Sequence, residues 1–322
     1  MTKIKTIQEA VKLIKDGDQI LTGGWTVIRR PMAAAHEIIR QGKKNLHIVC
    51  GTAGTDTDLL VGAGCLAIGE QAYVGSEKFG PAYNFQRAVA EGPEVSGFTY
   101  DDNSLLFAWL RIQAAAMGVP FLPTTSLLGS DILNPEYDTL KDMRGKNPKL
   151  AKKKYVTMKD PFFEGREVIL VPAIKPDVAI IHAQEGSKDG TICIKNCPFG
   201  DRIVAMSAPV TIVTVEKIVS NEEMTKHTAE NILPGMYVTA VVEMPYGAHP
   251  TQMPHYYDND PWFYKEYQAN AKSKDTFTKF VKEWILDTKD HQGYLAKLGE
   301  GRLQAIKADP VCGYNPTMER KV

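Results

Sequence analysis

The stretch Asp16-Gly17-Asp18-Gln19-Ile20-Leu21-Thr22-Gly23-Gly24-Trp25 decides the fold that this sequence predicts. A turn leads into a short apolar run that ends in two glycines, and a helical pattern begins after Pro31. This order is typical of a strand, a tight turn and a helix. Paired glycines allow positive φ angles and the close approach of a ligand, although such turns are also common packing devices. In an open α/β sheet, ligands bind in the crevice at strand ends of this kind.

The alternation of strands and helices continues on both sides of this stretch. A helix is predicted over residues 6–15, because Thr6 and Glu9 form a capping box ahead of apolar residues at helical spacing. Further strands are predicted over residues 45–50, 66–74, 167–171, 178–183, 191–194, 211–215 and 238–244, and helices over 31–42, 58–64, 101–117 and 276–288. The segments 120–130 and 256–264 are predicted to be loops. The sequence therefore predicts an α/β fold with an open, mostly parallel sheet flanked by helices.

The whole chain, residues 1–322, is predicted to form a single domain, because it contains no clear linker and no repeat. The segment from about 134 to 154 is polar and basic, and is predicted to be a surface excursion. Its cationic residues are Lys141, Arg144, Lys146, Lys149, Lys152, Lys153 and Lys154. We favour a solvated loop, and the alternative is contact with phosphates.

Composition excludes several classes of partner and site. Lys plus Arg and Asp plus Glu are balanced at 38 each, so no overall charge favours nucleic acid or an anionic membrane. Five scattered cysteines suit a reducing cytoplasm, and Cys193 and Cys197 have no second pair or histidine at zinc-site spacing, which predicts no metal. No cleavable leader and no apolar run of about 20 residues is present, so we expect a cytoplasmic protein without a membrane span.

The sequence lacks the G-x-S-x-G, P-loop and G-x-G-x-x-G motifs of hydrolases, NTPases and dinucleotide-binding enzymes. His182 and His249 are interpreted as hydrogen-bonded structural histidines rather than as catalytic bases. Glu77 follows a predicted strand directly and is the carboxylate best placed for chemistry. A glutamate there is either a nucleophile toward a thioester or a solvated loop residue beside Lys78.

Several stretches together resemble one family, the alpha subunits of class I CoA-transferases, and above all the glutaconate CoA-transferase type. The resemblance covers nearly the whole chain. It rests on Gly23-Gly24-Trp25 with Arg29-Arg30-Pro31, Ala53-Gly54 with Asp58-Leu59-Leu60, residues 118–123, His182-Ala183-Gln184 with Asp189-Gly190, and residues 246–250.

The resemblance implies a CoA-transferase-like fold and an enzyme made of two related subunits. The catalytic glutamate then lies in a beta subunit, where it forms an acyl-glutamyl anhydride and then a glutamyl-CoA thioester, so no catalytic residue is expected in this chain. Coenzyme A is a co-substrate, no cofactor is permanently bound, and the assembly is an α2β2 hetero-oligomer or larger. This chain contributes substrate contacts, which we assign to Ser76, Gly24, Trp25, Thr26 and Arg29.

The sequence departs from the glutaconate type around the expected substrate. Trp25 stands where phenylalanine is usual, Val27 and Ile28 are apolar where that type has polar residues, and Ser76 is followed by charged residues. These differences predict an acid other than the dicarboxylate, with a short monocarboxylic acid as the candidate. Two alternatives keep the fold: a CoA-ester hydrolase or decarboxylase in which Glu77 supplies the carboxylate, and a non-catalytic subunit that binds acyl-CoA.

Overall fold

The computed structural model describes residues 2–227 and 229–318, and its main element is a nine-stranded sheet. Parallel strands run in the order β12-β10-β8-β1-β2-β3-β4, and the antiparallel strands β9 and β11 extend from β8. Their bounds are β1 (Gln19–Thr22), β2 (Leu46–Ala53), β3 (Leu66–Val74), β4 (Thr99–Asp102), β8 (Val178–Ser187), β9 (Ile192–Ile194), β10 (Val210–Val219), β11 (Asn231–Leu233) and β12 (Ala240–Glu243). This is the open, mostly parallel sheet that the sequence predicts.

The strand order reverses between β1 and β8, which are neighbours in the sheet. From β1 the chain moves outward through β2 and β3 to β4, whereas from β8 it moves the other way through β10 to β12. All ten residues of β8 are buried, as expected for a central parallel strand. The reversal creates the topological switch point at which open α/β sheets bind ligands.

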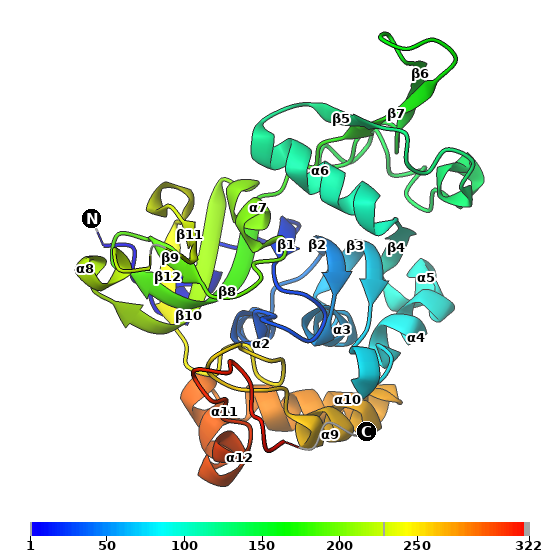
Figure 1. Ribbon diagram of the computed structural model, residues 1–322. Coiled ribbons are helices and arrows are strands. Elements are labelled where there is room, and N and C mark those ends of the chain that lie inside the picture. The colour runs from blue at the N-terminus through cyan, green and yellow to red at the C-terminus, as the bar shows by residue number, and fades with distance from the viewer. Residues whose placement is uncertain (1, 228, 319–322) are drawn as a thin grey trace.

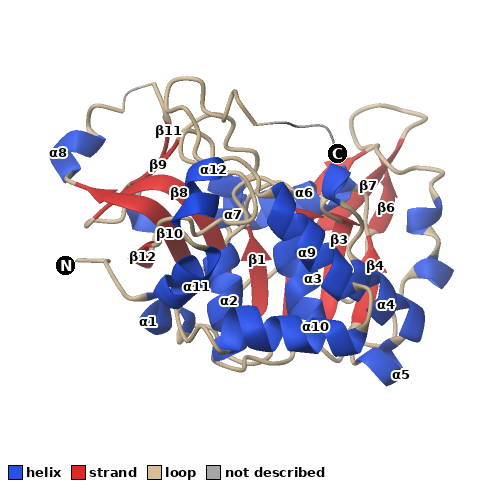
Figure 2. Cartoon of the chain, turned by 90° about the horizontal axis from the view of Figure 1, so that it is seen from below, coloured by secondary structure: helices blue, strands red, loops and turns tan. Residues whose placement is uncertain are grey.

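Helices cover both faces of this sheet, with α6 and α7 on one face and α2, α3 and α10 on the other (Figures 1 and 2). The helices are α1 (Ile7–Val11), α2 (Met32–Arg40), α3 (Thr55–Gly62), α4 (Tyr83–Glu91), α5 (Pro93–Ser96), α6 (Leu105–Met117), α7 (Asp201–Met206), α8 (Asn221–Met224), α9 (Pro261–Ala271), α10 (Lys274–Val281), α11 (His291–Leu298) and α12 (Glu300–Ala305). Shorter turns are η1 (Glu77–Phe79), η2 (Asp131–Leu133), η3 (Pro135–Tyr137), η4 (Gly235–Tyr237) and the π-helical η5 (Lys282–Leu286). No helix in the described ranges has the length and apolar character needed to cross a bilayer.

A small antiparallel sheet projects from the main sheet at the upper right of Figure 1. It has the order β5-β7-β6, with β5 (Phe121–Thr124), β6 (Val156–Lys159) and β7 (Glu167–Pro172). Helix α6 packs against β5 and β7, so it joins the two sheets. The basic segment 134–154 lies in the connection between β5 and β6.

Several predicted boundaries differ from those in the structure, and one of them concerns Gly51. Strand β2 does not end there but continues to Ala53, pairing Thr52 with Tyr73 of β3. Glycine is needed inside the strand because a Cβ at this position would lie 2.6 Å from the indole nitrogen of Trp109. The glycine therefore accommodates the packing of α6 and does not end the strand.

Two further errors concern helix starts, and a third concerns a missed strand. Asp101 belongs to β4, and α6 begins at Leu105 after Ser104, whose hydroxyl accepts the N-terminal hydrogen bond. The aromatic segment predicted as a loop contains α9, because Asp260 caps the Phe263 amide and Pro261 occupies the first helical turn. The segment 120–130, also predicted as a loop, contains β5.

Candidate active site

The turn after β1 lies at the switch point, at the carboxyl edge of the sheet. Gly23 N–H donates to the Ile180 carbonyl of β8 at 2.9 Å, so the turn begins while the chain still pairs with β8. Gly24 has φ +79°, and a Cβ there would lie 2.6 Å from the carbonyl oxygens of Ile28 and Arg29. A Cβ on Gly23 would collide with the Asp201 carboxylate. Close packing therefore requires both glycines, and at Gly24 the positive φ requires glycine as well.

Arg29 and Asp201 form an ion pair with no exposed side-chain surface. Arg29 donates to Asp201 Oδ2 through Nε at 3.1 Å and Nη2 at 2.6 Å, and through Nη1 to the Cys197 carbonyl at 2.9 Å. The other carboxylate oxygen accepts from Gly24 N–H at 2.5 Å. Asp201, the first residue of α7, therefore binds both Gly24 and Arg29 and so fixes the conformation of the turn.

A second buried pair, Arg30 with Asp56, connects β1 to the start of α3. The guanidinium donates to both Asp56 oxygens at 2.8 and 2.6 Å, to Thr22 Oγ1 at 2.6 Å and to the Thr52 carbonyl at 3.0 Å. Burial lowers the pKa of Arg30, but the Asp56 carboxylate outweighs it and the pKa is raised overall. The arginine therefore remains charged and holds the ends of β1 and β2 together.

Ser76 follows β3 and is 2% exposed. Its Oγ lies 3.1 Å from Thr55 Oγ1, which in turn lies 3.5 Å from the hydroxyl of Tyr264. Gly54, the residue before Thr55, packs against the Thr26 carbonyl so tightly that a Cβ would overlap it. A continuous path of contacts thus runs from the turn after β1 to the end of β3.

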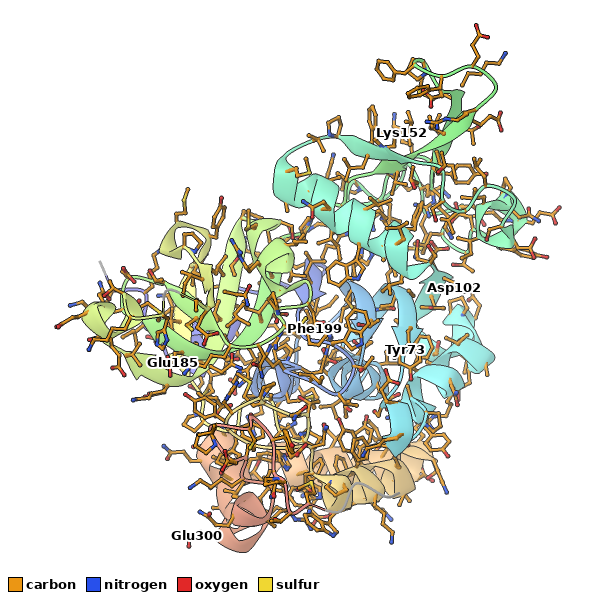
Figure 3. All side chains as sticks on the ribbon, in the orientation of Figure 1. Tyr73, Asp102, Lys152, Glu185, Phe199 and Glu300 are labelled. Carbon is orange, nitrogen blue, oxygen red and sulfur yellow. The ribbon has the colours of Figure 1, made fainter. Side chains whose placement is uncertain are left out.

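Trp25 is half-buried and stacks on Phe199 with ring centroids 5.3 Å apart and an interplanar angle of 23°. The Arg29 guanidinium carbon lies 5.3 Å from the centroid of the same Phe199 ring. Figure 3 shows Phe199 and Tyr73 over the middle of the molecule, on the side of the strand ends. An aromatic pair therefore lies against the turn after β1.

Glu77 is exposed and has φ +50°, a left-handed conformation that is rare for residues other than glycine. Burial and, next, the nearby Glu77 carboxylate raise the pKa of Tyr73. The carboxylate therefore lies on the surface beside the end of β3, next to Ser76 in the chain but outside the buried hydrogen bonds of Ser76.

The two histidines considered in the sequence are structural, as predicted. His182 is fully buried, with Nδ1 2.7 Å from Thr214 Oγ1 and Nε2 2.7 Å from Glu216 Oε1. His249 lies 2.6 Å from the Tyr294 hydroxyl and 2.9 Å from Asp260. Both nitrogens of each ring have a hydrogen-bonding partner, so neither histidine is available as a catalytic base.

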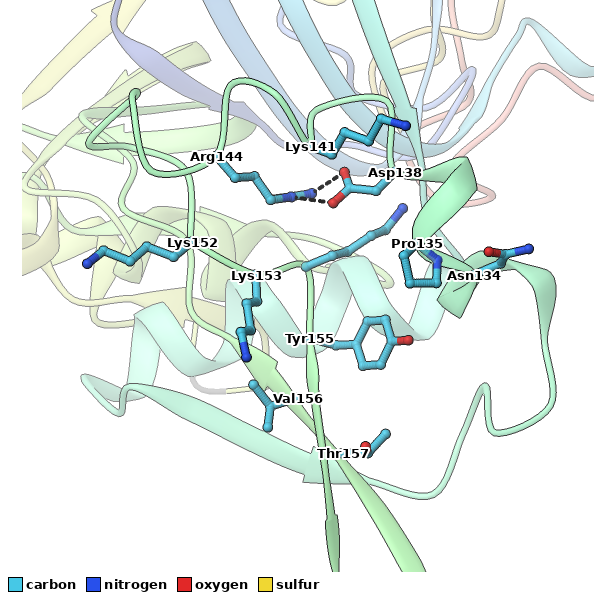
Figure 4. Close-up of a pocket in the computed structure, with 11 residues that line it drawn as sticks. Asn134, Pro135, Asp138, Lys141, Arg144, Lys152, Lys153, Tyr155, Val156 and Thr157 are labelled. Carbon is cyan, nitrogen blue, oxygen red and sulfur yellow. Dashed lines mark hydrogen bonds and ion pairs between the residues drawn. The ribbon is translucent and has the colours of Figure 1, made fainter.

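The basic segment forms most of the lining of a cavity of about 450 Å³ (Figure 4). Arg144 is engaged by Asp138, at 2.6 and 2.9 Å, and the buried Lys154 by Asp101 at 3.0 Å. Lys152 and Lys153 also line the cavity and are exposed. Two of the cations are therefore structural, while this exposed pair faces solvent.

The sequence pattern indicated the turn, and the family resemblance indicated Ser76. Neither indicated the residues that hold them in place, namely Asp56, Asp201, Thr55, Phe199 and Tyr264. The structure brings Gly24, Trp25, Thr26 and Arg29 together on one turn and links that turn to Ser76 through the Gly54–Thr55 segment. The side chain of Arg29 is fully buried and is paired with Asp201. The sequence signal for Asp56 and Asp201 is weak: each is an acidic residue in the first turn of a helix.

Comparison with known proteins gives a consistent result. The model of the coenzyme A transferase family matches residues 4–244. The A-type subunit of glutaconate CoA-transferase from Acidaminococcus fermentans is 40% identical over 322 residues, covering 100% of this chain and 99% of that protein. The A-type subunit of 3-oxoadipate CoA-transferase from Pseudomonas knackmussii is 33% identical over 303 residues, which is 94% of this chain and 100% of that protein.

Solved structures agree with the sequence comparisons. The crystal structure of glutaconate coenzyme A-transferase from A. fermentans superposes with a TM-score of 0.92 and 39% identity, covering 97% of this chain and 98% of that one. A variant of the decarboxylase AibA/AibB superposes with a TM-score of 0.72 and 28% identity, covering 88% of this chain and 100% of that one.

Proposed function

Because the chain belongs to the coenzyme A transferase family, we propose that the crevice at the switch point is half of a CoA-transferase active site, completed by a beta subunit. The chain is the alpha subunit of this enzyme. The observation that carries the proposal is its full-length similarity to the corresponding subunits of named CoA-transferases, together with the placement of the turn at the switch point.

The proposed reaction begins when a glutamate carboxylate in the beta subunit makes a nucleophilic attack on the carbonyl carbon of an acyl-CoA. The C–S bond breaks, CoA leaves as the thiolate, and an acyl-glutamyl anhydride forms. The thiolate then attacks the glutamyl carbonyl, which releases the first acid as its carboxylate and leaves a glutamyl-CoA thioester. An incoming carboxylate reverses these steps, so the energy of the thioester is conserved throughout.

The geometry of this chain supports a nucleophile from outside it. Asp56 and Asp201, the buried carboxylates next to the turn, are each held by two hydrogen bonds from an arginine side chain. A carboxylate paired in this way is stabilised as an anion, which makes it a poor nucleophile. Their proposed role is to keep Gly24, Trp25 and Thr26 in place as one wall of the site.

Ser76 is the proposed contact for the carboxylic acid substrate. Its hydroxyl donates or accepts toward Thr55, and a hydroxyl in this position can turn to donate to a carboxylate without adding charge. We expect Ser76→Ala to raise the KM for the acid about tenfold while the KM for acyl-CoA stays unchanged. Ser207→Ala, which removes a hydroxyl bonded within α7, is the matched control.

The function is tested by co-purifying the chain with its beta subunit, then incubating the pair with acyl-CoA. The expected result is CoA exchange with a free acid and a CoA-sized mass increase on the beta subunit. Exchange that persists with this chain alone would overturn the assignment of the nucleophile. The proposed assembly is cytoplasmic, α2β2 or larger, with CoA as a co-substrate and no permanently bound cofactor.

A second function, hydrolysis or decarboxylation of a CoA ester, is favoured by the exposed Glu77 at the same edge of the sheet and by the similarity to the decarboxylase structure. It predicts an activity that survives loss of the beta-subunit glutamate and is abolished by Glu77→Gln. Binding of acyl-CoA without turnover in the presence of the beta subunit would indicate instead a non-catalytic role for this chain.

A further inference from the structure

A second cluster of reactive side chains occupies the antiparallel extension of the main sheet. Glu185 of β8 lies directly opposite Cys193 of β9 in the antiparallel ladder, so the two side chains emerge on the same face. Cys193 is completely buried and Glu185 is 7% exposed. A thiol and a carboxylate thus share one small, largely buried site that the proposed CoA-transferase reaction does not use.

His227 completes this cluster from a distant part of the sequence. It follows α8, which is capped by the Ser220 hydroxyl and whose Met224 packs against Cys193. His227 Nε2 lies 2.7 Å from Glu185 Oε2, and the thiol, imidazole and carboxylate donor atoms all lie within 4.8 Å of one another. This group was invisible in the sequence, where Cys193 has no histidine at zinc-site spacing.

The hydrogen bonding of Glu185 is incomplete on the side that faces the cluster. Its Oε1 accepts from Lys195 Nζ at 2.8 Å, whereas Oε2 has no hydrogen-bond partner among the described residues. His227 Nε2 also lacks a hydrogen bond to any described residue. It lies close to Glu185 Oε2, but the two atoms are poorly aligned for a hydrogen bond. Nε2 and Oε2 thus face each other at ion-pair distance without a well-directed hydrogen bond, and with the Cys193 thiol they make three donors that converge on one side of the pair.

The Cys193 thiol and the Glu185 carboxylate stand on the same face of the ladder beside the His227 imidazole, so a cation bound there would contact all three donors. Lys195 would then remain on Oε1 as the outer partner that orients the carboxylate, a common arrangement around bound metal ions.

We propose that Glu185, Cys193 and His227 form a binding site for a zinc ion. One sulfur, one nitrogen and one oxygen donor match the mixed preference of Zn²⁺, whereas Mg²⁺ and Ca²⁺ prefer oxygen alone. Three protein donors leave a fourth tetrahedral position for water.

The site would stabilise the segment that leads to the crevice. Cys193 begins the stretch that continues through Cys197, whose carbonyl accepts from Arg29, to Phe199 and Asp201. A metal ion would therefore anchor the first residue of the segment that supports Trp25 and Arg29. This inference concerns binding and does not rest on the proposed function.

The test measures metal binding directly, on the untagged chain with its beta subunit, purified without chelator. We expect one zinc ion per chain by elemental analysis, and we expect Co²⁺ substitution to produce a thiolate-to-cobalt charge-transfer band. Cys193→Ser and His227→Gln should each weaken zinc binding at least about tenfold. Cys197→Ser, which alters an exposed cysteine four residues away, is the matched control and should bind normally.

Two results would overturn the proposal. One is a cobalt complex of the unmodified protein without a thiolate band, a measurement that does not depend on the folding of any variant. The other is zinc binding that Cys193→Ser and His227→Gln, shown by circular dichroism to be folded, leave unchanged.

Discussion

Arg29 and Asp201 lie at opposite ends of a completely buried ion pair that ties the turn after β1 to the first residue of α7, with Nη2 and Oδ2 2.6 Å apart. Removing one partner leaves the other charge buried and uncompensated. We therefore expect Asp201→Asn to lower the free energy of unfolding by about 3–5 kcal/mol, measured by urea denaturation. The control is Asp287→Asn, which breaks a Lys282 pair whose side chains are 68% and 56% exposed and should cost less than about 1 kcal/mol. Equal losses in the two variants would contradict the role given to burial.

Gly24 allows a prediction that separates close packing from backbone strain. Gly24 and Gly17 have φ +79° and +81°, but only a Cβ at Gly24 would meet other atoms within 4 Å. Gly17→Ala should therefore show the conformational cost alone, about 1–2 kcal/mol. Gly24→Ala should be less stable than Gly17→Ala by urea denaturation and should lose transferase activity, because it displaces the segment that carries Trp25. A Gly24→Ala enzyme as active as Gly17→Ala would contradict the assignment of the turn to the site.

Trp25 is predicted to set the choice of acid. We expect the enzyme to prefer short monocarboxylic acids over glutaconate in a comparison of kcat/KM. Trp25→Phe keeps an aromatic ring to stack on Phe199 but frees space, so relative kcat/KM for longer acids should rise up to about tenfold. Trp262→Phe makes the same change at a 49% exposed position and should leave the ranking of acids unchanged. A wild-type preference for glutaconate would show that the departures in sequence do not alter the acid.

The two interpretations of the basic segment make different predictions for Lys152 and Lys153. If these exposed lysines contact the phosphates of CoA, the double variant with alanine at both positions should raise the KM for acyl-CoA several-fold without changing kcat, and the effect should shrink at high salt. A double alanine variant of Lys274 and Lys279 on α10 is the control for surface charge. An unchanged KM would favour the solvated loop.

His291 is expected to make the fold sensitive to acid. Burial lowers its pKa to about 4, although the Pro245 carbonyl, which accepts from Nε2 at 2.7 Å, opposes the shift. An unfolded histidine titrates near 6.5, so between these values the unfolded chain binds the extra proton and stability falls as pH falls. Between pH 7 and 5 the wild type should lose about 2 kcal/mol more than His291→Gln. Urea denaturation at the two pH values checks this, and equal losses in the wild type and His291→Gln would contradict the prediction.

The fold could be predicted from local sequence patterns. The pairs of distant residues that hold the candidate site in place could not. Strand β3 has the predicted bounds 66–74, and the capping box of Thr6 and Glu9 is present, because both depend on neighbouring residues. The partners Arg29 and Asp201 are 172 residues apart, and no periodicity links them. The cluster of Glu185, Cys193 and His227 was missed for the same reason, since strand pairing and a loop bring its members together.

The position of β8 between β1 and β10 has a consequence for the order in which the chain is completed on the ribosome. Synthesis proceeds at about 5–20 residues per second, so Asp201 emerges roughly 10–30 s after Arg29. During that interval β1 presents an open strand edge and Arg29 an unmatched charge, which makes the nascent N-terminal half prone to misassociation. The proposed substrate-binding turn is therefore synthesised early but gains its buried partner late. Translation pauses or truncations before residue 201 should yield insoluble chains rather than a partly active enzyme.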